Sequence, residues 1–244
     1  MGLQINTSKT ETMSIGTQVV FQVNNVKLPR VDRFKYLGSY VSRDCMMNEE
    51  IHARIQSASC AFGRLRKRVF DCRELTVKTK VKVYDQCIIP LLLYGSETWP
   101  LYQKHVKQLS TIQQRHLRSI LSIKWDHFVS NEEVLKRANV LDMEIKLLKN
   151  RLRWMGHICR MNDTRPVKAL LFGELEGSRK VGRPLLRYKD TCKMALQRGK
   201  VLNEWNAVVN DRDKWKALIQ NVCKEHNQKR KADYEERRQK RHKC

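Results

Sequence analysis

The stretch VDRFKYLGSYVS, residues 31–42, is where the pattern of the chain changes from strand-like to helix-like. Aromatic and apolar residues surround a single glycine, Gly38, which is typical of a short strand approached closely by another part of the molecule. Two shorter apolar runs, 19–23 and 26–28, precede it, and the asparagine pair 24–25 between them favours a tight turn. About three short strands result, too few for a sheet domain with its own core.

After this stretch the period of the apolar residues becomes helical. Asn48 is a good candidate for a helix N-cap, and apolar residues then recur at spacings of three and four. We expect helices over about 48–69, 76–90, 106–120, 130–138, 142–159, 186–198 and 211–226. Met194, Trp205, Trp215 and Ile219 are the expected anchors of the last two, and Pro90 should kink or end the second. The predicted fold class is therefore mainly α, with a small β-hairpin piece at the N-terminus, a helical bundle and a helical C-terminal region.

Composition and the positions of glycine and proline divide the chain into five expected segments. They are a strand-like segment 1–45, a helical bundle 46–125, a helical connector 126–172, a basic loop with C-terminal helices 173–226, and a basic tail 227–244. The sequence GELEGSRKVGRP at 173–184 is rich in glycine and ends in proline, so it is the linker candidate. The tail has little to bury, and we expect a frayed helix or disorder there.

The charge balance is strongly basic, with 49 Lys and Arg against 25 Asp and Glu and a net charge of +24. Such a charge favours polyanionic partners, here RNA, DNA or RNA–DNA duplex, although a merely well-solvated surface is the alternative. Eight scattered cysteines without a CxxC pair, behind a polar start, indicate free thiols inside the cell, in the nucleus or cytoplasm. The longest apolar run, CIIPLLLY at 87–94, is far shorter than the roughly 20 residues of a membrane span. The oligomeric state is not predicted.

The cations are concentrated in segments that could follow a phosphate backbone. One group lies on the first long helix, opposite its apolar stripe, and another lies in and after the glycine-rich loop. Two arginines beside Trp154 could stack on bases, although core packing is the alternative for that ring. The cations predicted to contact nucleic acid from these patterns are Arg64, Arg66, Lys67, Arg68, Arg151, Arg153, Arg179, Lys180, Arg183 and Arg187.

Residues for independent catalysis are missing. The chain has no phosphate-binding glycine loop with a following lysine, no GxSxG, and no paired aspartates of the kind that hold two metal ions for nucleotidyl transfer. Zinc ligand types occur, but their spacing matches no standard finger, and His157 with Cys159 reads more simply as a polar contact and a buried thiol. We expect no metal site; the only weak candidates are Cys223, His226, His242 and Cys244.

Six pieces in the same order resemble a known family. They are GLQINTSKTETM at 2–13, FKYLGSYVS at 34–42, LLLYGSETW at 91–99, LSTIQQRHLRSIL at 109–121, RLRWMGHICRM at 151–161 and GRPLLRYKD at 182–190. Together they are similar to the C-terminal part of a non-LTR, LINE-type retrotransposon endonuclease–reverse transcriptase of the RTE kind. The likeness covers roughly 2–215.

The resemblance implies roles for several parts of the chain. Residues 2–13 would end the polymerase palm, with Lys9 as the palm lysine near the incoming nucleotide. Residues 34–41 would form the primer-grip hairpin, with Tyr36, Leu37 and Gly38 at the nucleic acid and a face that lacks its packing partners here. Residues 48–122 would form the thumb. The catalytic aspartates and the magnesium that they bind are expected with a palm upstream of Met1, so this chain alone is expected to be inactive.

Three hypotheses remain open at this stage. The chain is a nucleic-acid-binding thumb and C-terminal fragment of a reverse transcriptase, an independently retained basic module that binds nucleic acid or protein, or a relic of a truncated element. The DNA upstream of Met1 would distinguish them, because an in-frame aspartate-pair strand turn there would favour a piece of a full enzyme and a stop codon would favour a relic.

Overall fold

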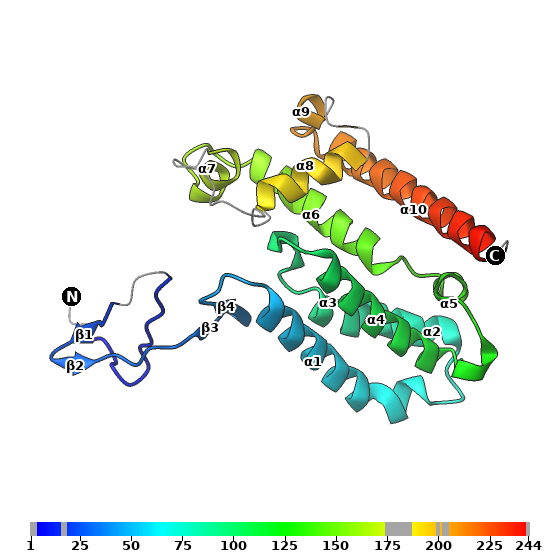
Figure 1. Ribbon diagram of the computed structural model, residues 1–244, viewed down its shortest axis with the longest axis horizontal. Helices are drawn as coiled ribbons and strands as arrows, with labels where there is room; N and C mark the ends of the chain where they lie inside the picture. Colours follow the sequence, from blue (N-terminus) through cyan, green and yellow to red (C-terminus); the bar gives the residue numbers. More distant parts are fainter. Residues whose placement is uncertain (1–3, 16–18, 174–186, 199–200, 202–204, 243–244) are drawn as a thin grey trace.

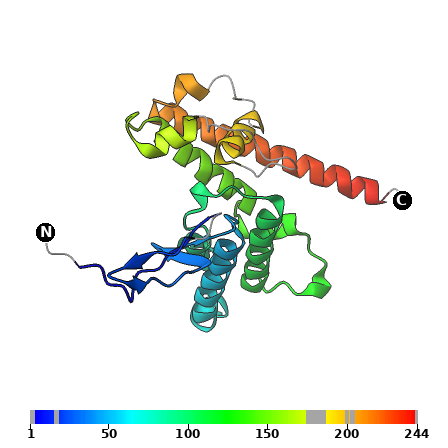
Figure 2. The ribbon, with the colours of Figure 1, turned by 60° about the vertical axis from the view of Figure 1, so that its left-hand side comes forward.

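The computed structural model describes residues 4–15, 19–173, 187–198, 201 and 205–242, without the side chains of residues 198, 237, 241 and 242. The fold is mainly α, with two small hairpins at the N-terminus followed by helices, as predicted (Figure 1). The first hairpin lies away from the helices at one end of the molecule, whereas the second lies beside the start of α1 (Asn48–Leu65) (Figures 1 and 2). Among the described residues, no helix is both long enough and apolar enough to cross a bilayer.

The first hairpin joins β1 (Gln22–Val23) to β2 (Val26–Lys27) through the predicted asparagine turn. Asn24 and Asn25 have φ values of 50° and 58°, the left-handed conformation that asparagine tolerates. An isolated bridge between Thr12 and Arg30 attaches the preceding segment to the chain that leaves this hairpin.

The stretch 31–42 is a second hairpin, as the resemblance implied, and not the single strand that its residue pattern predicted. β3 (Arg33–Tyr36) pairs antiparallel with β4 (Ser39–Ser42), and Leu37 and Gly38 form the turn with φ values of 47° and 87°. Two consecutive residues with positive φ are what a two-residue hairpin turn requires, and glycine adopts that conformation without strain. The main role of Gly38 is therefore to allow this turn.

Helical segments make up most of the remaining described chain. In order they are α1 (Asn48–Leu65), η1 (Arg66–Phe70), α2 (Val77–Val83), η2 (Tyr84–Ile88), α3 (Ile89–Leu92), η3 (Ser96–Thr98), α4 (Gln103–Ile120), η4 (Trp125–His127), α5 (Asn131–Ala138), α6 (Met143–Cys159), α7 (Pro166–Phe172), α8 (Tyr188–Arg198), α9 (Trp205–Val208) and α10 (Arg212–His242). The π turn η2 lies directly before Pro90, and the helix continues to residue 92 because the wider turn accommodates a residue without an N–H.

Capping residues account for several of these helix starts. The side chains of Thr76, Ser130 and Asp142 each accept a hydrogen bond from a backbone N–H in the first turn of the following helix. Asn48 does not cap α1: Met47 holds the cap position. The Asn48 Oδ1 atom lies 3.0 Å from Nε2 of the buried His105, so it connects α1 to α4 instead.

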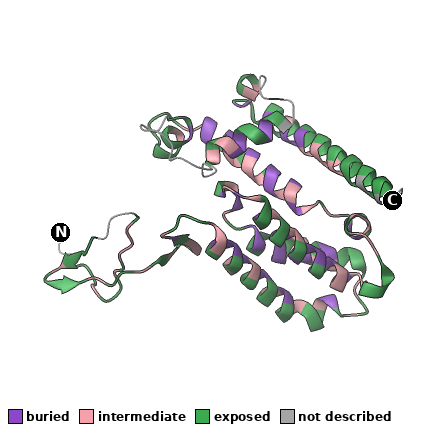
Figure 3. Cartoon of the chain, in the orientation of Figure 1, coloured by how far each residue is buried: buried purple, intermediate pink, exposed green. Residues whose placement is uncertain are grey.

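Most of the buried apolar residues in the described part of the chain form two clusters, and α6 contributes to both (Figure 3). In the first cluster, the Phe62 ring lies between Phe70, at a centroid distance of 4.4 Å, and His116, at 4.1 Å. In the second, α6 packs against α8 and α10. Gly156 makes this contact possible, because a Cβ added there would lie 2.0 Å from Nε1 of Trp215.

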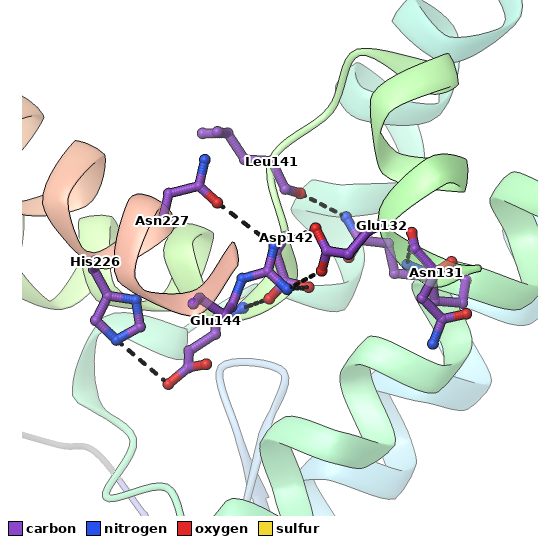
Figure 4. Close-up of polar contacts among 10 residues, drawn as sticks. Asn131, Glu132, Leu141, Asp142, Glu144, His226 and Asn227 are labelled. Atoms are coloured by element: carbon purple, nitrogen blue, oxygen red, sulfur yellow. Dashed lines mark hydrogen bonds and ion pairs between the residues drawn. The ribbon is translucent and has the colours of Figure 1, made fainter. Parts of the chain in front are cut away.

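Two expectations about the C-terminal part are wrong. Met194 is 38% exposed, because α8 turns Cys192, Ala195 and Leu196 toward the core in its place. Helix α10 continues through most of the expected frayed tail to residue 242. The polar C-terminal half of α10 is held by Arg230, which forms an ion pair with Glu132 and lies beside Asp142 and Asn227 (Figure 4). The linker candidate 173–184 lies outside the described residues except for Gly173.

Candidate nucleic-acid interface

The turn of the second hairpin is held by a buried ion pair on α1. Arg54 Nε lies 2.6 Å from Glu50 Oε1, and the two side chains are 10% and 2% exposed. The other carboxylate oxygen of Glu50 accepts a hydrogen bond of 2.6 Å from the Tyr40 N–H, while Arg54 donates to the Gly38 carbonyl. Both charges are thus compensated by each other and by the backbone of the hairpin, as buried charges require.

Tyr94 completes this attachment from the segment after α3. The Arg54 guanidinium lies 4.7 Å from the centroid of the Tyr94 ring, and the Tyr94 hydroxyl donates to the Leu37 carbonyl at 3.2 Å. The hairpin is therefore attached to the rest of the chain through its backbone, while Tyr36 and Leu37 of its apolar face remain 62% and 76% exposed, as expected for a face without packing partners. The sequence carried one overlooked signal: Glu50 and Arg54 lie four residues apart on the stripe that continues to Ala58.

A groove of about 760 Å³ lies between the second hairpin and α6. Tyr36, 62% exposed, and Leu37 line it from the hairpin, and Tyr94, 51% exposed, lines it from the side of α3. Lys149 and Arg153 line it from α6, and both are exposed. The groove thus brings partly exposed aromatic rings and two exposed cations together, a combination that suits unpaired bases and their phosphates.

Not every cation at this groove is available to a ligand. Lys146 forms an ion pair with Asp85 across the helices and is largely buried, so its charge is already compensated. Glu97 adds one carboxylate to the lining. The positive potential of the groove therefore comes mainly from Lys149 and Arg153.

A second groove continues from the first along α6 toward the N-terminal half of α10. The two grooves share Glu97, Lys149, Asn150 and Arg153 in their linings. The second adds two side chains of α6, the arginine directly after it, and two cations and one ring of α10, namely Trp154, His157, Arg160, Arg212, Lys216 and Trp215. The grooves together form a basic track across α6, with Glu97 as the only carboxylate among the described residues of the second groove.

Within this track, Trp154 takes neither of its two predicted roles completely. It is half-buried, lies against His157 at a centroid distance of 5.3 Å, and lines the second groove as well as a hollow beside α7 and α8. Part of the ring packs against the protein, and part is accessible. Arg151, by contrast, is half-buried, donates to the Trp99 carbonyl at 3.3 Å and lines neither groove.

The remaining predicted residues do not join the track. Arg64 lies at the C-terminal end of α1, about 21 Å of helix rise from Glu50, and the next three cations lie in η1 directly after it; all four, Arg64, Arg66, Lys67 and Arg68, are exposed. Arg187 is exposed in the hollow beside α7 and α8. Lys9 is exposed in a turn where its N–H is bonded to Asn6. Arg179, Lys180 and Arg183 lie outside the described residues.

The candidate zinc residues are spread along one helix. Cys223 and His226 are about 24 Å of helix rise from residue 242, so these positions cannot meet within a continuous α10. Burial raises the pKa of the Cys223 thiol, which disfavours the thiolate that zinc binds, and His226 lies 3.6 Å from a Glu144 oxygen (Figure 4). The described residues contain no cluster of three metal-ligand side chains. The side chain of His242 and all of Cys244 lie outside the described residues.

The fold and the track define a basic, mainly helical protein with connected surface grooves, and comparison with known proteins adds its relatives. The chain is 25% identical over 234 residues to a transposon-derived protein of Caenorhabditis elegans, a match that covers 90% of this chain and 83% of that protein. It is 27% identical over 150 residues to a protein of Drosophila melanogaster named as an RNA-directed DNA polymerase from the transposon X-element.

The Drosophila match covers 57% of this chain and only 16% of the polymerase. No family model matches the chain, and no solved structure matches it. These likenesses support a transposon-related origin and a relation to RNA-directed DNA polymerases of transposons.

Proposed function

We propose that this chain is a nucleic-acid-binding part of a LINE-type reverse transcriptase, in which residues 48–122 act as a thumb beside a C-terminal binding region. The observation that carries the proposal is the basic track, where Lys149 and Arg153 face the exposed Tyr36 and Tyr94 rings. Cations fixed along a groove attract phosphates, and accessible rings accept bases of any sequence by stacking. RNA, DNA and RNA–DNA hybrids are thus the proposed partners, in the nucleus or cytoplasm.

The overall charge and the relatives support the same proposal. A net charge of +24 supplies a long-range attraction for polyanions. The Drosophila relative is named as a polymerase that is directed by RNA, and such an enzyme must hold a template and a growing strand. The hairpin attached through Glu50 and Arg54 presents a fixed edge to that track, which fits a role in holding a strand.

Binding to a fluorescent RNA–DNA hybrid with a single-stranded overhang tests the proposal. We expect an affinity that falls steeply between 50 and 200 mM salt, because each phosphate contact releases counterions, as for other proteins that bind nucleic acid through about six or more phosphate contacts. The double change Lys149→Gln and Arg153→Gln should weaken binding on any sequence and flatten the salt slope by about two.

A matched control removes two exposed cations far from the track. Arg115→Gln with Lys136→Gln makes the same change of net charge on α4 and α5. If the control weakens binding as much as the track variant, binding is a diffuse charge effect and the proposed site is wrong. An affinity that does not change with salt would contradict the proposal as a whole.

The proposal assigns binding, not polymerisation, to this chain. The sequence contains no paired aspartates of the kind that hold two catalytic magnesium ions. We therefore expect no nucleotide incorporation on a primed template with magnesium. Robust incorporation would contradict this expectation, while leaving the proposed binding track intact.

A further inference from the structure

A short loop between α4 and α5 carries two aromatic side chains that project into solvent. Trp125 is 86% exposed and Phe128 is 87% exposed, more than any other large hydrophobic residue in the described part of the chain. Neither ring lines the two grooves of the basic track. Large apolar rings in water are unfavourable unless a partner covers them, so these two residues mark a candidate binding site.

The loop that carries these two rings is held by hydrogen bonds from α4. Phe128 has a φ of 48°, a left-handed conformation that is strained for a bulky residue and persists only when its surroundings hold it. Directly after it, the Arg118 guanidinium donates to the Val129 carbonyl at 2.8 Å and to the Asn131 side chain at 2.9 Å. The loop is thus fixed directly after Phe128, where the ring is 87% exposed.

Cations gather at the same end of the helical bundle. Phe62 of α1 stacks on both Phe70 of η1 and His116 of α4, so α1 and α4 run side by side and end together (Figures 1 and 2). The C-terminal end of α1 and η1 then supply the exposed cluster that the sequence singled out, and the loop adds one lysine; the set is Arg64, Arg66, Lys67, Arg68 and Lys124. The exposed carboxylates beside these cations are Asp71, which forms an ion pair with Arg66 at 3.3 Å, Glu74 and Asp126.

We infer that this end of the bundle is a second nucleic-acid site, specific for single strands, in which Trp125 and Phe128 stack on unpaired bases. The cations would hold the phosphates on either side. Single strands are favoured because bases inside a duplex are already stacked on one another and closed to a ring that approaches from the side. The inference rests on the proposed function for its ligand class, and adds a separate site for single strands at the other end of α1.

Oligonucleotides with and without bases separate stacking from charge. Binding of a 12-nucleotide oligo-dT would be compared with that of an abasic chain of equal length, which has the same phosphates. The double change Trp125→Ala and Phe128→Ala should reduce the affinity for oligo-dT on the order of tenfold and leave the abasic chain unaffected. The single change Trp125→Phe keeps a ring and should retain most of the affinity.

Leu170 provides the matched control, because it is an apolar residue, 77% exposed, on α7 away from this loop. Leu170→Ala should leave both affinities unchanged. Equal thermal melting of all variants, followed by circular dichroism, would show that the fold is intact, as expected for changes at exposed positions.

Several results would overturn the inference. They are an unchanged oligo-dT affinity in the double variant, equal affinity of the wild-type protein for the two oligonucleotides, self-association in sedimentation that depends on the two rings, or ring-dependent binding to phosphatidylserine vesicles in place of oligo-dT. If hybrid binding keeps its steep salt dependence while the ring variants have no effect, only this inference fails. If the wild-type protein binds no hybrid and no single strand, the proposed function fails with it.

Discussion

The two N-terminal hairpins have similar turns and very different surroundings. Each reverses direction through two consecutive residues with positive φ, at 24–25 in the first and 37–38 in the second. The first hairpin leaves Phe21 47% exposed and Val26 50% exposed, whereas the second is bound to α1 by the buried Glu50–Arg54 pair.

This difference shows that the residues of a turn determine whether a hairpin forms, but not where that hairpin is held in the fold. A two-residue turn is a local property, and it forms wherever residues that tolerate positive φ stand between extended segments. An isolated two-stranded hairpin is at best marginally stable in water, so a fixed position requires contacts from elsewhere in the chain. In this protein α1 and Tyr94 provide those contacts for the second hairpin alone.

The largest expected effect comes from breaking the buried pair. Glu50→Ala leaves the Arg54 charge buried without its partner, and we expect a loss of about 3 kcal/mol in the free energy of unfolding. Urea denaturation followed by circular dichroism measures it. Glu49→Ala is the control, because Glu49 forms only an exposed pair with Arg33 at 3.3 Å, worth at most about 1 kcal/mol. Equal losses in the two variants would show that the pair does not anchor the hairpin.

Lowering the pH should loosen the second hairpin together with the bundle that holds it. Burial, with a smaller contribution from Arg115, lowers the pKa of His116 to about 4, so the folded protein excludes a proton that the unfolded chain binds below about pH 6.5. Stability is then complete above pH 6.5 and falls toward pH 4, by about 2 kcal/mol between pH 8 and pH 5. Burial also lowers the pKa of His105, which acts in the same direction.

Hydrogen exchange read by NMR at several pH values measures this coupling. Amides of β3 and β4 should lose protection as the pH falls, while those of β1 and β2 should change little. His116→Phe keeps a ring in the stack with Phe62 and should flatten part of the dependence. Parallel loss of protection in both hairpins would contradict the contrast between them.

A change in each turn tests whether turn strain reaches the rest of the fold. Gly38→Ala imposes a φ of 87° on a residue with a side chain, and we expect a loss of about 1 kcal/mol or more in stability. The added Cβ would lie 3.9 Å from the Tyr94 ring, an ordinary contact, so the effect comes from the backbone. Asn25→Ala in the first hairpin should leave the denaturation midpoint unchanged. A similar shift from both variants would mean that the first hairpin is also coupled to the core.

The smallest expected effect concerns the Tyr94 hydroxyl. Tyr94→Phe removes its hydrogen bond to the Leu37 carbonyl but keeps the ring beside Arg54, and should lower stability by about 0.5–1 kcal/mol. Tyr36→Phe is the control, since that side chain is 62% exposed and its hydroxyl can bond to water. A loss above 2 kcal/mol from Tyr94→Phe would show that the ring has moved as well.

Much of the fold could be predicted because it follows from short-range patterns. The apolar period located the helices, and the caps at Thr76, Ser130 and Asp142 are side-chain to backbone bonds within one turn. The predicted site was recovered only in part. One groove is lined by Tyr36, Leu37 and Arg153. Arg151, two positions before Arg153 on α6, does not line it and donates a hydrogen bond to the Trp99 carbonyl instead.

By itself, the sequence determined the helical character, the caps, the two turns and the excess of positive charge, because each depends on residues within a few positions of one another. Only the tertiary structure decided that stretch 31–42 is held by Glu50, Arg54 and Tyr94, and that α6 places Lys149 and Arg153 opposite the hairpin. It also decided that Trp125 and Phe128 remain in water. These features join segments up to about 120 residues apart, and the burial that makes such contacts strong exists only once the helices have packed.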